Sequence, residues 1–386
     1  MSERLARIAY YCPMKSPTHP VPSGDRLLAQ LIEQALRLAG FDVELVRATR
    51  AWRRQPVGLD TLHATLERQA QRYLSEVDRG VRPRPALWFT YHNYYKAPDL
   101  LGPHVARALG IPYCVAEPSW SSRQLRTPWR RNAQAVRAGL LGARRLFHLN
   151  PADRPACVAL CGAAVNVALP PFLGADPLPA TPRSQCRASL VEQFGLAPEH
   201  PWLISVAMMR ADAKHTSYHI LGQALQRLCA MPWQWLVVGD GPAAPALRRT
   251  LTALLGERVV FTGQLSSTDV ATALAAADGY VWPGIREAFS MALLEAQAVG
   301  LPAVVGHTPG IAGIVHHRRT GLLVPNQHHA DFTQRFAAAI EVTLQDAPLR
   351  RRLGQAARQK VLRRHSVSAA SETLRSQLTA LLASPP

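Results

Sequence analysis

The sequence predicts an α/β protein built from two doubly wound parallel-sheet domains with a cleft between them. Three observations predict this fold class. A chain of 386 residues is too long for one ordinary core. Short apolar runs alternate with amphipathic helical stretches, twice over. A proline-rich segment at residues 168–185 separates the two series. We therefore expect domains at residues 1–168 and 169–365, with a C-terminal helix at 366–386 that can pack back on the first domain.

The first domain is predicted from five short apolar runs bounded by turn residues, which we interpret as strands. These runs are Arg7–Cys12, Asp42–Val46, Ala86–Tyr91, Pro112–Ala116 and Arg145–Leu149. Between the first two, Arg26–Ala39 places leucine, isoleucine and alanine along one face, which is typical of an amphipathic helix.

The second domain repeats this alternation with six runs. They are Trp202–Met208, Trp235–Val238, Val259–Thr262, Tyr280–Trp282, Ala303–Val305 and Leu322–Val324. Helices are expected at Tyr218–Cys229 and at Ala288–Val299, and a last one at Ser366–Ala383. Strands that alternate with helices form parallel sheets, so functional residues are expected where the strands end.

Composition excludes several classes of protein. With 48% hydrophobic and 18% charged residues, the chain is globular rather than disordered. It has neither an apolar run long enough to span a membrane nor a secretory signal, so we expect a cytoplasmic protein. The six cysteines follow no metal or disulfide spacing, which favours reduced, buried thiols.

The net charge of +18 favours anionic partners such as phosphates, nucleic acid or an acidic membrane surface. Residues 1–168 hold 24 Lys and Arg against 12 Asp and Glu. Seven arginines lie in Arg123–Arg145, interleaved with Trp120 and Trp129. Two interpretations remain open: a membrane-surface contact, or a solvated helix face with a core tryptophan.

The most informative stretch is Pro283–Val305, where a strand ends at Trp282 and a helix is expected from about Ala288. Glu287 and Glu295 are eight positions apart, which on a helix means one face and a separation of about 12 Å.

Between these two glutamates, the first backbone N–H groups of the helix would lack intrahelical partners and could bind a diphosphate. These groups belong to Phe289, Ser290 and Met291. Glu295 could then accept ribose hydroxyls and Glu287 a sugar hydroxyl. The alternative is that Glu287 has no ligand role, because acidic residues are common in the first turn of a helix.

The run from Glu287 to Glu295, followed by Gly300-Leu-Pro302, resembles the signature of the retaining glycosyltransferases of the GT-B fold, family 4. Upstream, the turn at residues 239–242 reads Gly-Asp-Gly-Pro, and downstream the segments at 310–315 and 320–324 fit the closing part of the family pattern. Together these elements extend over residues 202–324.

This resemblance implies a hexosyltransferase that uses a nucleotide-sugar donor, retains configuration and needs neither cofactor nor metal. Arg210 and Lys214 are similar to the family's pair of cations on the donor diphosphate. Gly239 and Gly241 would also lie at the donor. Gly24, in Ser-Gly-Asp, occupies the place of the family's glycine loop, and an ordinary helix start is the equal alternative.

The resemblance also implies polar residues at strand ends of the first domain. Where the family often has a histidine that touches the sugar, this chain has Glu117, so His92 is the substitute candidate. A structural histidine in an aromatic cluster is the alternative for His92. We expect Glu287, His92 and Glu117 to be the catalytic residues. Gly313 stands where the family commonly has a glutamate, which implies either a different sugar or weaker contacts at that edge.

The predicted function is therefore transfer of a sugar to a glycan or lipid-linked acceptor hydroxyl, in cell-envelope or exopolysaccharide synthesis. The protein could bind peripherally to the inner face of the membrane. The alternative is a non-catalytic nucleotide or nucleic-acid binder on the same scaffold. No recognition helix or stacking motif is present, so no nucleic-acid partner is expected. A Gly-x-Gly-x-x-Gly run is also missing, which argues against a dehydrogenase.

Overall fold

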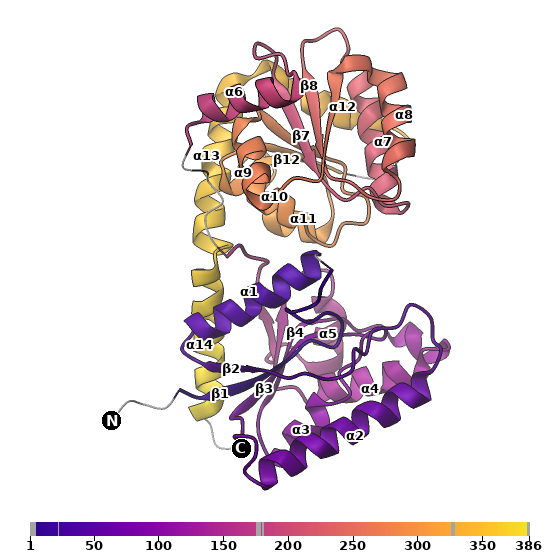
Figure 1. The fold of residues 1–386 in the computed structure, drawn as a ribbon, viewed down its shortest axis with the longest axis vertical. Helices are drawn as coiled ribbons and strands as arrows, with labels where there is room; N and C mark the ends of the chain where they lie inside the picture. Colours follow the sequence, from indigo (N-terminus) through magenta and orange to yellow (C-terminus); the bar gives the residue numbers. More distant parts are fainter. Residues whose placement is uncertain (1–4, 22, 175–178, 180, 326–328, 384–386) are drawn as a thin grey trace. The chain divides into compact units, whose positions relative to one another are not determined.

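The computed structural model describes residues 5–21, 23–174, 179, 181–325 and 329–383. The chain forms two compact units (Figure 1). Unit 1 comprises Met1–Gly174 and Val367–Pro386, and unit 2 comprises Ala175–Ser366. Both ends of the chain therefore belong to unit 1, and unit 2 is inserted between its last strand and its last helix.

Unit 1 contains a six-stranded parallel sheet in the order β2-β1-β3-β4-β5-β6. Its strands are β1 Arg7–Tyr11, β2 Asp42–Leu45, β3 Leu87–Asn93, β4 Tyr113–Pro118, β5 Arg145–His148 and β6 Asn166–Ala168. The helices of this unit are α1 Gly24–Leu38, α2 Leu59–Asp78, α3 Gly102–Leu109, α4 Arg130–Leu141, α5 Arg154–Cys161 and α14 Val367–Ala383, with a 3₁₀ turn at Ser122–Arg126.

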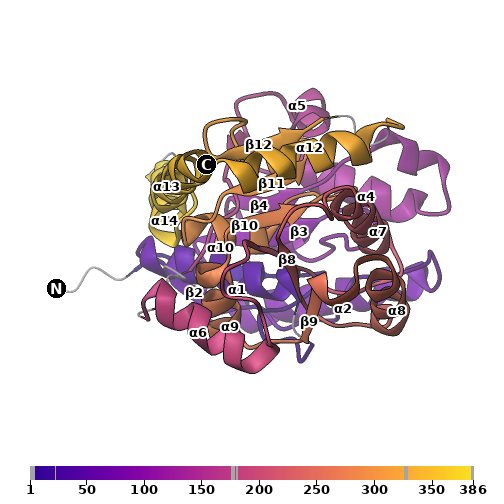
Figure 2. The ribbon, with the colours of Figure 1, turned by 90° about the horizontal axis from the view of Figure 1, so that it is seen from above.

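Unit 2 repeats the plan with a second six-stranded parallel sheet, in the order β12-β11-β10-β7-β8-β9. The strands are β7 Trp202–Val206, β8 Gln234–Val238, β9 Val259–Gly263, β10 Gly279–Trp282, β11 Ala303–Gly306 and β12 Gly321–Val324. Its helices are α6 Arg183–Phe194, α7 Ala213–Gln226, α8 Ala244–Leu255, α9 Ser267–Ala276, α10 Met291–Ala298, α11 Pro309–Ile314, α12 Phe332–Gln345 and α13 Ala347–Arg364 (Figures 1 and 2).

The predicted fold class is confirmed, since each unit is a parallel sheet flanked by helices. All eleven predicted strands are present, with ends that differ by one or two residues. The short strand β6 was not predicted, because its three residues carry too little periodicity to distinguish them from a loop. Central strands such as β3, β10 and β11 are buried on both faces, which explains their nearly continuous apolar runs.

The C-terminal helix α14 packs on α1 inside unit 1. Leu374 and Leu378 on this helix are fully buried. The Arg375 guanidinium donates hydrogen bonds to the carbonyl oxygens of Ala39 and Leu38, which caps the end of α1 with a cation. The last helix is therefore part of the core of unit 1, although about 190 residues separate it from the rest of that unit.

The six cysteines are all free. Four of them are buried, as expected, but Cys161 is half-buried and Cys229 is exposed, so the expectation of buried thiols was wrong for these two. Among the helices of the described residues, none combines the length and the hydropathy that crossing a bilayer would require.

Candidate functional site

The carboxyl ends of β7 and β10 lie side by side, because these two strands are neighbours in the parallel sheet of unit 2. The chain leaves β7 through a short loop and enters α7, whose N-cap Asp212 accepts a hydrogen bond from the backbone N–H of Lys214. After β10 it turns through Pro283–Ser290 before α10 begins. Two loops far apart in the sequence thus meet at one edge of the sheet.

Lys214 and Glu287 form the central ion pair of this edge. The Lys214 Nζ lies 2.9 Å from Glu287 Oε1 and 2.8 Å from Oε2. The indole N–H of Trp282 donates to the same carboxylate at 3.3 Å. The side chains of Lys214 and Glu287 are 26% and 14% exposed, so water screens this pair less than it would a surface pair.

Backbone contacts fix the loop that carries Glu287. Its N–H donates to the carbonyl of Gly284, and its own carbonyl accepts a hydrogen bond from the hydroxyl of Thr308 at 2.9 Å. The Ile285 N–H donates to Ser217 Oγ on α7 at 3.1 Å, which ties the two loops together. These hydrogen bonds therefore hold the loop, and with it the Glu287 carboxylate, in a fixed position.

Glu287 lies in the loop before the helix, as predicted, but the helix starts later than the expected Ala288, so the helical spacing of about 12 Å between Glu287 and Glu295 does not apply. Helix α10 begins at Met291, and Glu287 lies in the loop before it. Ser290 is the N-cap, and its hydroxyl accepts a hydrogen bond from the backbone N–H of Leu293 at 3.3 Å. The physical reason is that a serine hydroxyl caps a helix well, whereas Arg286 in the loop has a left-handed φ of 55° that a helix cannot include.

Unpaired backbone N–H groups nevertheless lie between the two glutamates. Among the described residues, no hydrogen bond is donated by the backbone N–H of Phe289, Ser290 or Met291. The first two precede the helix and the third is its first residue. Because these donors lie at the positive end of α10, they form a favourable environment for an anion.

Glu295 lies in the second turn of α10 and is half-buried. Its carboxylate makes no hydrogen bond or ion pair among the described residues. Burial raises the pKa of this carboxyl to about 7. A largely desolvated acceptor without a partner is suited to a ligand that brings hydroxyl donors.

Gly239 and Gly241 are required by the packing of the chain itself. Gly239 has a φ of +134°, and a Cβ on it would lie 2.1 Å from the carbonyl oxygen of Ala207. At Gly241 the corresponding distance is 2.4 Å to the carbonyl oxygen of Met209. The turn after β8 therefore presses directly on the loop after β7, and it holds in place the segment that leads to Arg210.

Arg210 is exposed at the end of this loop. Its guanidinium contacts the sulfur of Met208 at 3.0 Å and takes part in no ion pair among the described residues. Unlike Lys214, this cation therefore has no carboxylate that an anionic ligand would have to displace.

In unit 1, His92 and Glu117 come together at the ends of the neighbouring strands β3 and β4. The His92 Nε2 lies 4.0 Å from Glu117 Oε2 and 3.8 Å from Oδ1 of Asp25, which is in the first turn of α1. Both His92 and Glu117 have left-handed backbones, with φ of 69° and 54°. Such strain in residues other than glycine is often found at functional sites.

Burial controls the ionisation of this group. It lowers the pKa of His92 to about 3, so the imidazole is neutral. It also raises the pKa of Glu117 to about 8, helped by the negative charges of Asp25 and Asp153. His92 Nε2 and Glu117 Oε2 are buried and have no hydrogen-bond partner. The His92 ring also contacts the ring of Tyr91, with 4.1 Å between their centroids, so the predicted aromatic surroundings are present as well.

Gly24 is the first residue of α1, and the hydroxyl of Ser23 caps this helix by accepting from Arg26 N at 3.2 Å. Locally, Gly24 therefore belongs to an ordinary helix start, which was the alternative interpretation. A Cβ on Gly24 would meet no atom of the chain within 4 Å, so the space beside it is open.

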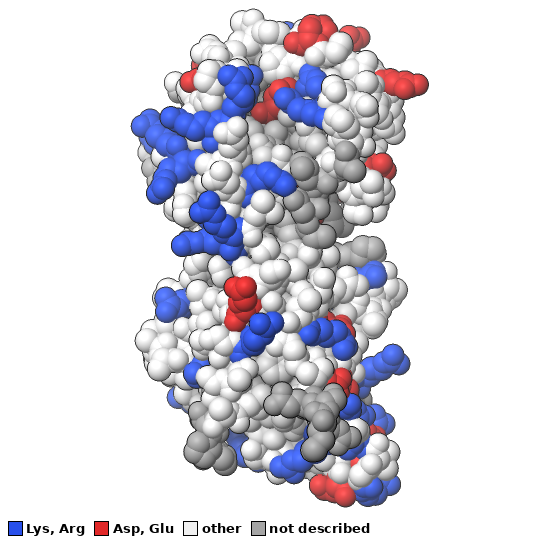
Figure 3. Space-filling view, turned by 90° about the vertical axis from the view of Figure 1, so that its left-hand side faces the viewer, with Lys and Arg blue, Asp and Glu red and all other residues white. Residues whose placement is uncertain are grey.

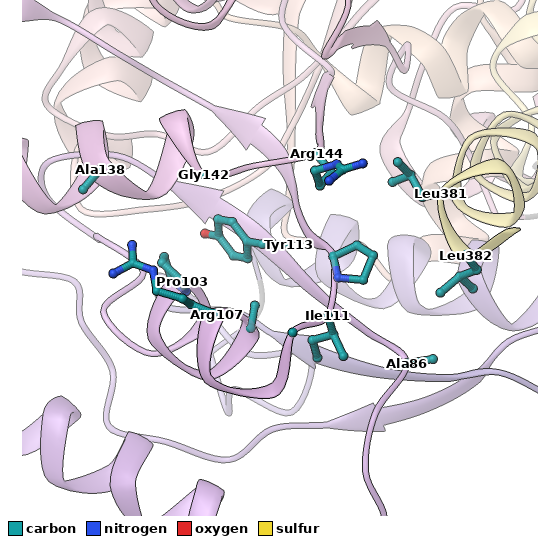
Figure 4. Close-up of a pocket in the computed structure, with 13 residues that line it drawn as sticks. Ala86, Pro103, Arg107, Ile111, Tyr113, Ala138, Gly142, Arg144, Leu381 and Leu382 are labelled. Atoms are coloured by element: carbon teal, nitrogen blue, oxygen red, sulfur yellow. The ribbon is translucent and has the colours of Figure 1, made fainter. Parts of the chain in front are cut away.

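A cavity of about 460 Å³ in unit 1 lies away from these strand ends. Ala86 and Pro112, which line it, precede β3 and β4, so it opens at the amino end of the sheet. Figure 4 shows Tyr113 and Ile111 opposite Leu381 and Leu382 of α14. Ligands of open α/β sheets bind at the opposite, carboxyl edge.

The tryptophans of the arginine-rich segment belong to the core. Trp129 is 8% exposed and contacts Tyr95 edge-on at 5.3 Å, and Trp120 packs partly buried against the core of unit 1. The arginines themselves are mostly exposed, so the structure has the solvated helix face with a core tryptophan. Basic side chains also gather on unit 2, on the side where α13 lies (Figure 3).

Among the described residues, no group of three or more His, Cys, Asp and Glu side chains is placed to hold a metal ion. The adjacent histidines His316 and His317 are exposed, as is His329, and His328 lies outside the described residues.

Residues 200–346 match the family model described as "Glycosyl transferases group 1". The matched segment lies within unit 2 and covers less than half of the chain. Its boundaries include every residue of the edge described above, from Arg210 and Lys214 to Glu287 and Glu295. Gly24, His92 and Glu117 lie outside the matched segment.

Two curated relatives extend the likeness beyond the segment that matches the family model. The chain is 28% identical over 204 residues to the alpha-D-kanosaminyltransferase of Streptomyces kanamyceticus, covering 53% of this chain and 51% of that protein. It is 29% identical over 288 residues to the 2-deoxystreptamine N-acetyl-D-glucosaminyltransferase of Streptomyces fradiae, covering 71% and 66%. The chain thus matches about half to two thirds of the length of these relatives.

A solved structure shows the same fold over nearly the whole chain. It is that of Anabaena HepE in complex with UDP and glucose, with a TM-score of 0.70, 18% identity and coverage of 97% of this chain and 100% of that chain. Two parallel six-stranded sheets with flanking helices are the architecture of GT-B glycosyltransferases. The segment that matches the family model thus lies in the second half of a GT-B fold.

Sequence reasoning missed several residues that shape the site. Trp282 and Thr308 contact Glu287, Ser217 anchors its loop, and Asp25 completes the cluster around His92. No local signal marks the first three, since their partners lie 5 to 68 positions away. Asp25 was visible only as an acidic residue in a first helical turn.

Proposed function

We propose that this protein is a glycosyltransferase that moves a hexose from a nucleotide-sugar to an acceptor hydroxyl with retention of configuration, as in family 4. The observation that carries the proposal is the Lys214–Glu287 ion pair beside the unpaired N–H groups of Phe289, Ser290 and Met291. A diphosphate needs both cations and N–H donors, and the two lie at one edge of the sheet.

In this proposal the donor lies along the loop before α10 and its first turns. Arg210 and Lys214 bind the diphosphate together with the three N–H groups. Glu295 accepts the two ribose hydroxyls, and the Glu287 carboxylate accepts a hydroxyl of the sugar. Gly239 and Gly241 contribute by holding the loop of Arg210 in position. When a phosphate binds, Lys214 divides its three N–H donors between that phosphate and Glu287.

The chemical step needs no nucleophile from the protein. The acceptor oxygen forms a bond to the anomeric carbon on the face from which the nucleotide departs, as the bond from that carbon to the phosphate oxygen breaks. The proton of the acceptor hydroxyl passes to the departing phosphate oxygen. Arg210, Lys214 and the N–H groups stabilise the negative charge that develops on the leaving diphosphate.

Within unit 1, His92 and Glu117 are the residues proposed to be catalytic. Gly24 leaves open space beside the backbone of α1, as a phosphate-facing glycine would. The relatives named for kanosaminyl and N-acetyl-D-glucosaminyl transfer, and the neighbour that holds UDP and glucose, support a hexosyl donor.

The biological setting also remains a proposal: a glycan or lipid-linked acceptor in cell-envelope or exopolysaccharide synthesis, at the cytoplasmic face of an anionic membrane. The net charge of +18 and the exposed arginines of α4 and α13 favour such a surface.

The test has two stages. Thermal shift against UDP, GDP, ADP and NAD identifies the ligand class, because only a specific ligand raises the midpoint. Transfer from the matching nucleotide-sugar is then followed by NMR, which reports the anomeric configuration of the product. An inverted product would refute retention, and the lack of any response to nucleoside diphosphates would refute the function as a whole.

A further inference from the structure

Two histidines of α7 in unit 2 face each other one helical turn apart. The Nε2 atoms of His215 and His219 are 3.3 Å apart, and the ring centroids are 4.4 Å apart with the planes inclined by 60°. Residues four positions apart on a helix lie on one face. Among the described residues, neither ring has another hydrogen-bond or ion-pair partner. Two nitrogen ligands therefore converge on one point of this helix.

The helix that carries these histidines is held firmly in place. Tyr218 and Leu221 are fully buried, and the Ser217 hydroxyl accepts a hydrogen bond from the backbone N–H of Ile285. The two histidines themselves are half-buried, so water and dissolved ions can reach them. The spacing of the two rings is thus set by the folded helix before any ligand arrives, which lowers the cost of binding.

The distance between the two nitrogens fits a shared metal ion. Zinc binds a histidine nitrogen at about 2.0–2.1 Å with tetrahedral angles, which places two such nitrogens about 3.3–3.4 Å apart. The observed separation is 3.3 Å. A hydrogen bond from N–H is usually shorter, at about 2.7–3.2 Å. The pair is therefore spaced more like two ligands of one ion than like a strong hydrogen bond.

We propose that His215 and His219 bind one divalent transition-metal ion, such as Zn²⁺, through their Nε2 atoms. This inference goes beyond the proposed function and does not depend on it. Imidazole nitrogen suits zinc and its neighbours, whereas Mg²⁺ and Ca²⁺ prefer oxygen ligands. No third His, Cys, Asp or Glu completes a set with the two in the described part of the chain, so water would fill the remaining positions.

The charges of the first helical turn do not prevent this binding. Lys214 precedes His215 in the chain, but its ammonium group is paired with Glu287. The N-cap of the same turn is the carboxylate of Asp212. The positive end of α7 would weaken the binding of a cation by about fivefold at most. Two ligands that share one ion gain about 100-fold over a single ligand, which is the larger effect.

The test is a titration of the full-length protein, prepared without a histidine tag, with ZnCl₂ by calorimetry at pH 7.5. Imidazole is ordinarily neutral there and has a lone pair for the metal. His215→Gln and His219→Gln should each weaken the binding of the tightest zinc ion about 100-fold. The double variant should be hardly weaker than either single one, because the first substitution already breaks the shared site. His316→Gln removes an exposed histidine of unit 2 and is the matched control, with unchanged affinity.

A second measurement does not depend on the variants. In protein labelled with ¹⁵N at histidine, one equivalent of Zn²⁺ should shift the Nε2 signals of two rings together, as expected for nitrogens that bind the same ion. Zinc should also raise the melting temperature of the wild type and not that of the single variants, because the unfolded chain does not hold the two rings together. In EDTA the variants should melt like the wild type, which shows that they fold.

Zinc affinity that is unchanged in both single variants, or that falls in only one of them, would overturn the inference. A shift of one Nε2 signal alone, or of none, would do the same. The proposed function is tested separately, because His215 and His219 have no part in it. In EDTA, His215→Gln and His219→Gln should bind nucleoside diphosphates as the wild type does, so either proposal can fail while the other stands.

Discussion

The ammonium group of Lys214 lies within 2.9 Å of both carboxylate oxygens of Glu287, a residue 73 positions further along the chain. The parallel pairing of β7 with β10 brings the two loops together, and Trp282 contributes its indole N–H to the same carboxylate. Each charge thus neutralises the other at a half-buried edge of the sheet. A ligand with a phosphate and a hydroxyl would have a cation for the first and an acceptor for the second.

Replacing Glu287 should separate binding from transfer. We expect Glu287→Gln to lower turnover by at least about 100-fold, because an acceptor positioned for the reacting sugar is weakened. Affinity for the free nucleoside diphosphate should stay the same or rise, because Lys214 no longer shares its charge with a carboxylate. Turnover and calorimetric affinity measure the two effects. Glu199→Gln, an exposed glutamate of unit 2, serves as control; wild-type turnover in Glu287→Gln would contradict the assignment.

Arg210→Ala should weaken binding of a nucleoside diphosphate about tenfold, because a charge-assisted contact with phosphate is lost. Affinity for the nucleoside without phosphates should not change. The melting temperature should also remain within about 1 °C of wild type, since Arg210 is exposed and has no ion pair among the described residues. Arg249→Ala is the matched control, because Arg249 is also an exposed arginine of unit 2, on α8. Equal loss of nucleoside and diphosphate binding would argue for a general disturbance of the loop.

Gly239→Ala should destabilise unit 2 by about 3 kcal/mol or more, because the new Cβ would collide with the backbone of Ala207 as well as adopt a positive φ. Gly195→Ala is the matched control: Gly195 has a φ of +65° but open space around it, so only the backbone cost of about 1 kcal/mol is expected. Calorimetric unfolding of both variants gives the comparison. Similar losses in the two proteins would show that the contact with Ala207 relaxes.

Nucleotide affinity should depend on pH through Glu295. Because burial raises its pKa to about 7, the carboxylate is half protonated there, and only the ionised form accepts both ribose hydroxyls. Affinity should therefore increase as pH rises through 7 and level off above about 8. The ratio of wild-type to Glu295→Gln affinity removes the titration of the phosphates themselves. A ratio that stays constant from pH 5.5 to 8.5 would contradict the role of this carboxylate.

The raised pKa of Glu295 also makes the stability of the folded protein depend on pH. Here a rise in pH lowers stability, whereas it increases nucleotide affinity. The folded protein holds the Glu295 proton more tightly than the unfolded chain, so this residue favours folding most at low pH. Its contribution should decline between about pH 4.5 and 7 and stay constant above. Glu295→Gln should therefore gain stability relative to wild type as pH rises through this range, which thermal unfolding at several pH values measures.

The order of strands and helices, and the places of the motifs along them, could be derived from the sequence alone. Runs such as Trp235–Val238 are buried on both faces, and their apolar residues between turn residues are a local property that needs no partner to be recognised. Ser290 is also a local signal: a serine N-cap marks the start of α10 better than the acidic residue before it.

The tertiary structure decided which distant segments of the chain contact each other. Lys214 meets Glu287, Gly239 presses on Ala207, and His92 lies between Asp25 and Glu117 only because parallel strands gather their carboxyl ends at one edge. Burial at that edge then sets the charge of Glu117 and Glu295, since the cost of ionising a carboxyl depends on how much water the fold leaves around it. Periodicity and spacing contain no measure of that cost, so the ionisation of the site is a property of the folded chain.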